Sequence, residues 1–319
     1  MRRIILDTDL SMGEPGSEID DGFALALALS DPALSVELVT TVNGNTDVDT
    51  ATALTIELLD RLERSDVPVV RGADRPLVRS QHDPAAGDRA AASRQRPSSA
   101  RVRPGHAAAA IADAVTAEPG ALTIVAIGPL TNVALALRLD PAVATTVREL
   151  VVMGGVFTRT TNQLAMPGEF NTWVDPDATA AVLASGIPLR FVGLDVTLQV
   201  RLGREDAAAM AAAGGRFGPF AAECTTAWID ALEQSGHADA GAPAGTCAMH
   251  DPLAVAVVSR PELVTWRPAV VAVETASEVT RGVAVAEFSA EPGADTCEVG
   301  VAVDVDGFRS LFLERIGAL

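Results

Sequence analysis

The 319-residue sequence contains no lysine, so all 24 of its basic side chains are arginines. Reactions that need a deprotonatable amine, such as Schiff-base catalysis, and phosphate loops that depend on a lysine are therefore excluded. Tyrosine is also absent, and aromatic residues make up only 4% of the chain. Because 48% of the residues are apolar and alanine is abundant, the composition predicts a globular protein with helices packed closely on a sheet.

Positive charge is scarce, since 42 acidic side chains against 24 basic ones give a formal net charge of −18. Such a chain repels phosphate backbones and anionic lipid surfaces, so we expect no nucleic-acid polymer and no membrane as a partner. The opening Met1-Arg2-Arg3 does not lead into a signal peptide, because Asp7 and Asp9 interrupt the apolar run that follows it. The three widely spaced cysteines fit neither a disulfide framework nor a zinc site. We therefore expect a cytoplasmic protein.

Short apolar strands alternate with helical segments along most of the chain. Strands are predicted at 3–8, 35–42, 67–70, 122–127, 149–153 and 188–192, and helices at 20–30, 47–62 and 131–139. This alternation predicts an α/β fold with a mostly parallel, Rossmann-like sheet covered by helices on both faces. Later strand-like runs at 269–274, 283–288 and 299–305 predict a smaller C-terminal β element, followed by a closing helix.

Two long segments interrupt this alternation. Residues 73–104 are rich in Arg, Pro, Ser and Asp, and residues 214–249 combine an amphipathic stretch around Trp228 with a Gly/Ala/Pro-rich loop. Both are interpreted as insertion loops over the sheet. Because no internal repeat is present, we predict a single domain over residues 1–319.

Acidic and amide side chains gather immediately after the predicted strands. They are Asp7, Asp9, Asp20, Asp21, Asn43, Asn45, Asn162, Glu169 and Asn171, with His250 and Asp251 at the start of a late helix. Ligands in an open α/β sheet bind at the carboxyl ends of the strands, so we expect these side chains to meet there. Carboxylates packed without counter-cations are costly, which predicts a hard metal ion among them. Taken singly, Asp20 and Asp251 are also typical helix caps, and Asn45 and Asn171 are typical turn residues.

A series of motifs in chain order resembles the nucleoside hydrolases of the inosine-uridine-preferring type. The motifs are Asp7-Thr8-Asp9, Asp20-Asp21, Gly44-Asn45, Gly128-Pro129-Leu130-Thr131-Asn132, Met153-Gly154-Gly155, Glu169-Phe170-Asn171, Asp175-Pro176, Gly193-Leu194-Asp195-Val196-Thr197 and His250-Asp251. The resemblance extends from about Ile4 to beyond Asp251. It implies hydrolysis of the N-glycosidic bond of a small-molecule ribonucleoside to the free base and ribose. It also implies a homodimer or homotetramer.

The resemblance further implies a role for each site residue. A calcium ion (Ca2+) would be held by Asp9, Asp21, the carbonyl of Ile127 and Asp251, and Asp9 would also be the general base. The implied ribose-binding residues are Asp20, Asn45, Asn162, Glu169 and Asn171. His250 matches a late histidine that protonates the leaving base in purine-active members, and its alternative role is packing beside Asp251.

A carboxylate-rich pocket suits this chemistry for reasons independent of the resemblance. Cleavage of an N-glycosidic bond passes through an oxocarbenium-like state, so a water must be positioned under C1 while positive charge grows on the sugar. Calcium can fix the sugar diol and lower the pKa of a bound water, and the carboxylate of Asp9 can accept the proton.

The sequence departs from the family pattern in two places. The family has a compact Asp-x-Asp-Pro-Gly-x-Asp-Asp segment, whereas here residues 10–19 separate the two Asp motifs and form a third insertion. Glu14 and Glu18 of this insertion lie beside the predicted metal site. The family also carries a His-Gly in a base-binding loop, where this chain has His82-Asp83-Pro84, so the nucleobase preference is not implied.

Two other functions stay open on the sequence. Asp7-Thr8-Asp9 after a first strand also resembles the nucleophile loop of haloacid-dehalogenase-type magnesium phosphatases, although such enzymes normally add a Lys or Arg to neutralise phosphoryl charge. A non-catalytic nucleoside- or sugar-binding protein would use the same ribose-binding residues, which we call the ribose clamp. Bacterial examples of such proteins are usually exported, and no export signal is visible here.

Overall fold

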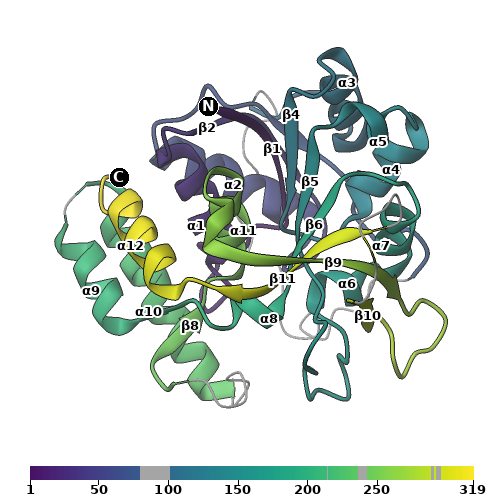
Figure 1. The fold of residues 1–319 in the computed structure, drawn as a ribbon. Coiled ribbons are helices and arrows are strands. Elements are labelled where there is room, and N and C mark those ends of the chain that lie inside the picture. The colour runs from purple at the N-terminus through teal and green to yellow at the C-terminus, as the bar shows by residue number, and fades with distance from the viewer. Residues whose placement is uncertain (80–100, 214, 236–242, 289–290, 292–295) are drawn as a thin grey trace.

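A nine-stranded β-sheet runs through the computed structural model, which describes residues 1–79, 101–213, 215–235, 243–288, 291 and 296–319 (Figure 1). Its strands are β1 (Arg2–Thr8), β2 (Leu34–Thr41), β3 (Val69–Arg71), β4 (Leu122–Ala126), β5 (Glu149–Met153), β6 (Leu189–Val192), β9 (Val264–Val273), β10 (Ala284–Glu287) and β11 (Cys297–Val303). The order across the sheet is β10-β9-β11-β6-β5-β4-β1-β2-β3. Strands β1 to β6 and β11 pair in parallel, whereas β9 and β10 are antiparallel to their neighbours.

Helices cover both faces of this sheet (Figure 1). One buried cluster contains Ile4 and Leu6 of β1 together with α1 (Asp20–Ser30), α2 (Val48–Arg61), α10 (Phe217–Ser235), α11 (His250–Ser259) and α12 (Val305–Ile316). A second cluster contains Ile5 of β1 together with α3 (Ala107–Ala117), α4 (Thr131–Leu139), α5 (Val143–Thr146) and α7 (Pro176–Leu183). Because successive strand residues point to opposite faces, the two clusters lie on opposite sides of the sheet.

Shorter elements complete the described chain. They are α6 (Phe170–Val174), α8 (Leu194–Thr197), α9 (Arg204–Ala212), a 3-10 turn at Pro261–Leu263, and the strands β7 (Arg201–Gly203) and β8 (Thr246–Ala248). Strands β7 and β8 pair antiparallel in a small separate sheet. In the part of the chain that the structure describes, no helix is both long enough and apolar enough to cross a membrane.

The predicted mostly parallel α/β fold is confirmed. The helices predicted at 20–30 and 131–139 and the strand predicted at 149–153 have these same bounds in the structure. The C-terminal strands extend the main sheet, since β11 lies parallel to β6 and antiparallel to β9, and β9 carries β10 at the sheet edge. Within the segment 214–249 the structure contains α10 and β8. Residues 80–100, which include His82-Asp83-Pro84, and residues 236–242 lie outside the described part.

The segment 10–19 packs into the interior beside the N-terminus of α1. Leu10, Met12 and Ile19 are almost completely buried. A hydrogen bond also links the two ends of this segment, because the Ser11 hydroxyl donates to the carbonyl of Glu18 at 2.9 Å. This insertion is therefore a fixed part of the fold on the side of the sheet that carries α1 and α10.

The order of the strands reverses beside β1, which is third from the β3 edge of the sheet. Strand β1 has β2 on one side and β4 on the other, so the chain leaves these neighbouring strands in opposite directions. A ligand site is expected outside the carboxyl ends of the strands at such a point. Asp9, Asn43 and Ile127 follow β1, β2 and β4 at this point of the sheet.

Candidate active site

Four aspartates converge at the carboxyl end of β1. Asp9 follows this strand, Asp20 and Asp21 begin α1, and Asp251 is the second residue of α11. Helices α1 and α11 are almost entirely apolar and pack against each other, which brings their N-termini together. Carboxylate oxygens of Asp20, Asp21 and Asp251 lie within 4.8 Å of one another, a spacing at which the three could hold a metal ion. We call these four residues the carboxylate cluster, and none of them is more than 4% exposed.

Asn45 joins two members of the carboxylate cluster. Its backbone N–H donates to Oδ2 of Asp9 at 2.7 Å, and its side-chain Nδ2 donates to Oδ2 of Asp21 at 3.0 Å. The other oxygen of Asp21 accepts a hydrogen bond from the hydroxyl of Thr8. The loop after β2 therefore holds both carboxylates in fixed orientations.

Two glycines make room for the Asp9 carboxylate. A Cβ atom at Gly44 would overlap the Asp9 carboxylate, and one at Gly128 would come within 2.8 Å of its Oδ1. Gly44 follows β2 and Gly128 follows β4, so the backbone approaches Asp9 from both neighbouring strands. This close approach explains why the Gly-Asn and Gly-Pro motifs occur at these strand ends.

Asp20 and His250 are linked through the start of α11. Oδ2 of Asp20 accepts hydrogen bonds from the backbone N–H groups of His250, at 3.1 Å, and Asp251, at 3.2 Å. A carboxylate at a helix N-terminus is stabilised by these unpaired N–H groups and by the helix dipole. His250 is half-buried, and Nδ1 of its ring lies 2.7 Å from Oγ1 of Thr197.

Burial raises the pKa of every carboxyl in the cluster. The pKa values of Asp20 and Asp21 rise to about 6, mainly because both groups are removed from water. Burial and then the charge of a neighbouring aspartate raise the pKa values of Asp9 and Asp251 well above the ordinary value. In addition, Oδ1 of Asp9 and Oδ1 of Asp20 are buried and have no hydrogen-bond partner among the described residues. Such an arrangement is unfavourable unless a cation or a bound polar ligand contacts these oxygens.

The predicted residues of the loop after β5 form a second group beside the cluster. Nδ2 of Asn171 donates to the carbonyl of Ile127 at 2.8 Å and to the carbonyl of Met153 at 3.3 Å. Glu169 caps α6, because its carboxylate accepts the backbone N–H groups of Asn171 at 2.7 Å and Thr172 at 3.0 Å. Burial raises the pKa of Glu169. Asn171 and Glu169 are thus held rigidly at the carboxyl ends of β4 and β5.

Asn162 lies apart from the other predicted residues. It is exposed in the loop between β5 and α6 and has a φ of +57°, in the left-handed region that Asn tolerates. Its side-chain oxygen accepts a hydrogen bond of 2.7 Å from the hydroxyl of Thr160 in the same loop. The structure therefore brings together nine of the ten residues predicted for the site, namely Asp9, Asp20, Asp21, Asn45, Ile127, Glu169, Asn171, His250 and Asp251.

Three supporting residues had no predicted role in the site. Thr8 holds Asp21 and Thr197 contacts His250, as described above. Asn132 holds Asp7, whose Oδ1 also accepts the hydroxyl of Thr40, and burial raises the pKa of Asp7 to about 7. Each of these supporting residues belongs to one of the motifs that resemble the family, so the motifs could have indicated that it has a role in the site.

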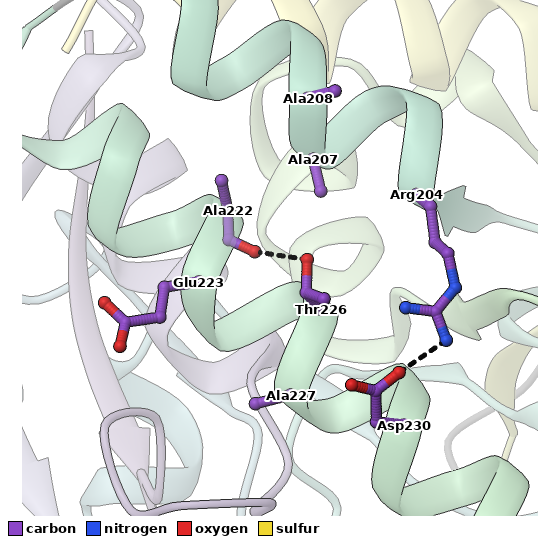
Figure 2. A pocket seen from close by; sticks show the side chains of 8 residues that line it. All are labelled: Arg204, Ala207, Ala208, Ala222, Glu223, Thr226, Ala227 and Asp230. Atoms are coloured by element: carbon purple, nitrogen blue, oxygen red, sulfur yellow. Dashed lines mark hydrogen bonds and ion pairs between the residues drawn. The ribbon is translucent and has the colours of Figure 1, made fainter.

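A surface cavity lies elsewhere, between α9 and α10 (Figure 2). Small side chains line it, including Ala207 and Ala227, and Arg204 forms an ion pair of 2.6 Å with Asp230 at its edge. None of the predicted site residues lines this cavity. It is therefore separate from the carboxylate cluster.

Comparison with known proteins identifies relatives over the whole chain. The family model described as inosine-uridine preferring nucleoside hydrolase matches residues 4–310. The non-specific ribonucleoside hydrolase RihC of Salmonella paratyphi C is 37% identical over 319 residues, which cover 98% of this chain and 96% of that protein.

Solved structures agree with this match. A purine-preferring ribonucleoside hydrolase from Gardnerella vaginalis superposes with a TM-score of 0.86 at 29% identity, covering 99% of this chain and 98% of that one. A plant nucleoside hydrolase superposes with a TM-score of 0.84 at 26% identity, covering 100% of this chain and 99% of that one.

Proposed function

From the premise that this chain belongs to the inosine-uridine preferring nucleoside hydrolase family, we propose that the carboxylate cluster binds calcium and that Asp9 is the general base. The protein is a hydrolase that acts on the N-glycosyl bond of ribonucleosides. The family match does not favour the phosphatase or the non-catalytic binding protein.

The donor set of the cluster fits a hard divalent cation. Every available ligand is an oxygen, the chemistry that calcium prefers, and two carboxylate oxygens of the cluster, Asp9 Oδ1 and Asp20 Oδ1, have no protein partner among the described residues. We assign Asp9, Asp21, Asp251 and the carbonyl of Ile127 as its ligands. When bound, calcium supplies a fixed charge that orients the sugar diol and lowers the pKa of a bound water.

Asp9 is suited to accept the proton of the attacking water. Its Oδ2 is fixed by the backbone N–H of Asn45, while its Oδ1 has no hydrogen-bond partner in the described part of the chain. Burial raises the pKa of Asp9 in the metal-free protein. Asp9 therefore offers one carboxylate oxygen in a fixed position for the transfer.

The remaining predicted residues bind the sugar and assist the leaving group. Asp20, Asn45, Glu169 and Asn171 are assigned to the ribose hydroxyls, whereas Asn162, which was expected to join them, lies apart in an exposed loop. His250 is assigned to the leaving nucleobase, to which its ring donates a hydrogen bond. The rigid hydrogen bonding of Asn171 and Glu169 supports this assignment, because a fixed polar group pays little entropy on binding.

We also propose the setting in which the enzyme acts. The substrate is a small-molecule ribonucleoside and not a nucleic-acid polymer, which the net charge of −18 supports because it repels phosphate. We further propose a homodimer or homotetramer that acts in the cytoplasm.

The two unpartnered carboxylate oxygens at the centre of the cluster carry this proposal, and the ribose clamp offers a direct test. Uridine and 2′-deoxyuridine should be compared by measuring free base and free sugar in the presence of calcium. A clamp left unpaired by the missing hydroxyl should reject the deoxynucleoside by roughly 10⁴-fold in kcat/KM. Comparable turnover of the two nucleosides would refute the clamp.

A further inference from the structure

A hydrogen bond between two helices fixes the ring of His250. Nδ1 of this ring lies 2.7 Å from Oγ1 of Thr197. Thr197 ends α8 and is fully buried, whereas His250 begins α11 and is half-buried. The backbone N–H of His250 is held separately by Asp20. The ring is therefore anchored on its Nδ1 side at the edge of the carboxylate cluster.

The surroundings of Thr197 decide the direction of this hydrogen bond. A hydroxyl can donate or accept, and so can Nδ1, depending on the tautomer of the ring. Within the described residues, Nδ1 of His250 is the acceptor that the Thr197 hydroxyl reaches. If Nδ1 carried the hydrogen, the buried hydroxyl of Thr197 would find no acceptor for its own hydrogen among the described residues, which is unfavourable. Thr197 therefore donates and Nδ1 accepts.

We propose that Thr197 is a positioning residue that keeps the hydrogen of the neutral His250 ring on Nε2, where it forms a hydrogen bond to the departing nucleobase. An acceptor at Nδ1 requires the neutral imidazole to carry its hydrogen on Nε2, on the ring edge away from Thr197. As the glycosidic C–N bond breaks, its electron pair moves onto the base, and a donor at Nε2 stabilises the negative charge that builds there. This inference rests on the proposed role of His250.

If Thr197 positions His250, the loss of kcat on removal of its hydroxyl should depend on the leaving group. Thr197→Val keeps the volume of the side chain and removes the hydroxyl. For uridine, kcat should fall by about 10²-fold with KM little changed, on the order of the contribution of a positioned proton donor. A nitrophenyl riboside, whose leaving group departs as a stable phenolate, needs no such donor and should keep a kcat close to the wild-type value.

Two further variants separate positioning from folding. Thr197→Ser retains a hydroxyl and should restore the kcat for uridine. Thr55→Val is a matched control, because Thr55 is a fully buried threonine whose hydroxyl donates only to the carbonyl of Ala51 at 2.8 Å in the described structure. This control should leave both activities unchanged. An equal loss with both substrates in Thr197→Val, or no loss with either, overturns the proposal.

The tautomer can also be read directly in the wild-type enzyme, which covers the case in which Thr197→Val does not fold. Two-bond 1H–15N correlation spectra of histidine-labelled protein, recorded at a pH at which the spectra themselves show a neutral ring, should show the His250 hydrogen on Nε2. The signal is assigned by its loss in His250→Gln. A hydrogen on Nδ1 overturns the proposal.

Failure of this inference can be distinguished from failure of the proposed function. If His250→Gln loses uridine turnover but Thr197→Val does not, His250 acts without Thr197 and only the inference fails. If His250→Gln turns over uridine at the wild-type rate, the role of His250 itself is wrong, and the inference fails with it.

Discussion

Lowering the pH from 7 to 5 should weaken calcium binding by about an order of magnitude, because protons compete with the cation for the buried carboxylates. The lower pH acts on Asp20 and Asp21, because burial raises their pKa values from an ordinary value of 3.8 to about 6. An exposed aspartate would stay ionised over this range. The buried carboxyls of Asp20 and Asp21 therefore titrate between pH 5 and pH 7.

The size of the effect follows from the titration of one ligand. An acid with a pKa of about 6 is roughly nine-tenths ionised at pH 7 and one-tenth ionised at pH 5, so Asp21 alone weakens binding about tenfold. The pKa values of Asp9 and Asp251 are raised as well, which makes the dependence steeper. The calcium affinity should then fall by tenfold or more over these two pH units.

The pH dependence of folding stability should have opposite signs with and without calcium. In the metal-free protein the folded chain retains protons that the unfolded chain releases between pH 3.8 and about 6, so its stability falls as the pH rises through this range. Calcium stabilises the folded form by binding to the ionised carboxylates, and this gain grows as the pH rises.

Calorimetric titration of chelator-treated protein with calcium at pH 5, 6 and 7 measures the affinity, and thermal melts with and without calcium measure the stability. Asp66→Asn is a matched control, because Asp66 is exposed and a hydrogen bond from Arg64 lowers its pKa. This variant should keep the wild-type pH dependence. Equal calcium affinity at pH 5 and pH 7 would refute the reasoning.

Two substitutions test the supports of the site. Gly44→Ala places a Cβ onto the Asp9 carboxylate and should lower kcat sharply. Gly203→Ala is the control, because its Cβ would meet nothing closer than 3.7 Å, and it should leave kcat unchanged. A wild-type kcat in Gly44→Ala would show that Asp9 needs no such space. Asp7→Asn removes a carboxyl whose pKa burial raises to about 7, so the fall in metal-free stability between pH 5 and pH 8 should become shallower. Unfolding curves at the two pH values measure this change, and an unaltered slope would contradict it.

The parts of the fold that were predictable from the sequence are those that depend on local patterns. The helix at 20–30 and the strand at 149–153 are apolar runs with clear boundaries, and the structure has the same bounds. The meeting of the aspartates was predictable as well, because parallel strands place their carboxyl ends along one edge.

Contacts between distant segments and the conformations of single loops were not predictable in the same way. The bond between Thr197 and His250 joins two helices that are far apart in the sequence. The capping of α6 by Glu169 depends on a loop conformation that no periodicity encodes. The exposed position of Asn162 likewise follows from the conformation of one loop. The joining of β11 to β6 depends on long-range pairing, for which the sequence carries no local signal.

The rate of nucleoside hydrolysis by Asp9→Asn tests the central claim most directly. The amide keeps the size of the side chain and one oxygen for the cation but cannot take a proton from water. With calcium bound and the melting temperature close to that of the wild type, base release from uridine should fall by roughly 10²–10⁴-fold. Turnover at close to the wild-type rate would contradict the account, and the base would then be sought at Glu14 or Glu18 in the segment 10–19.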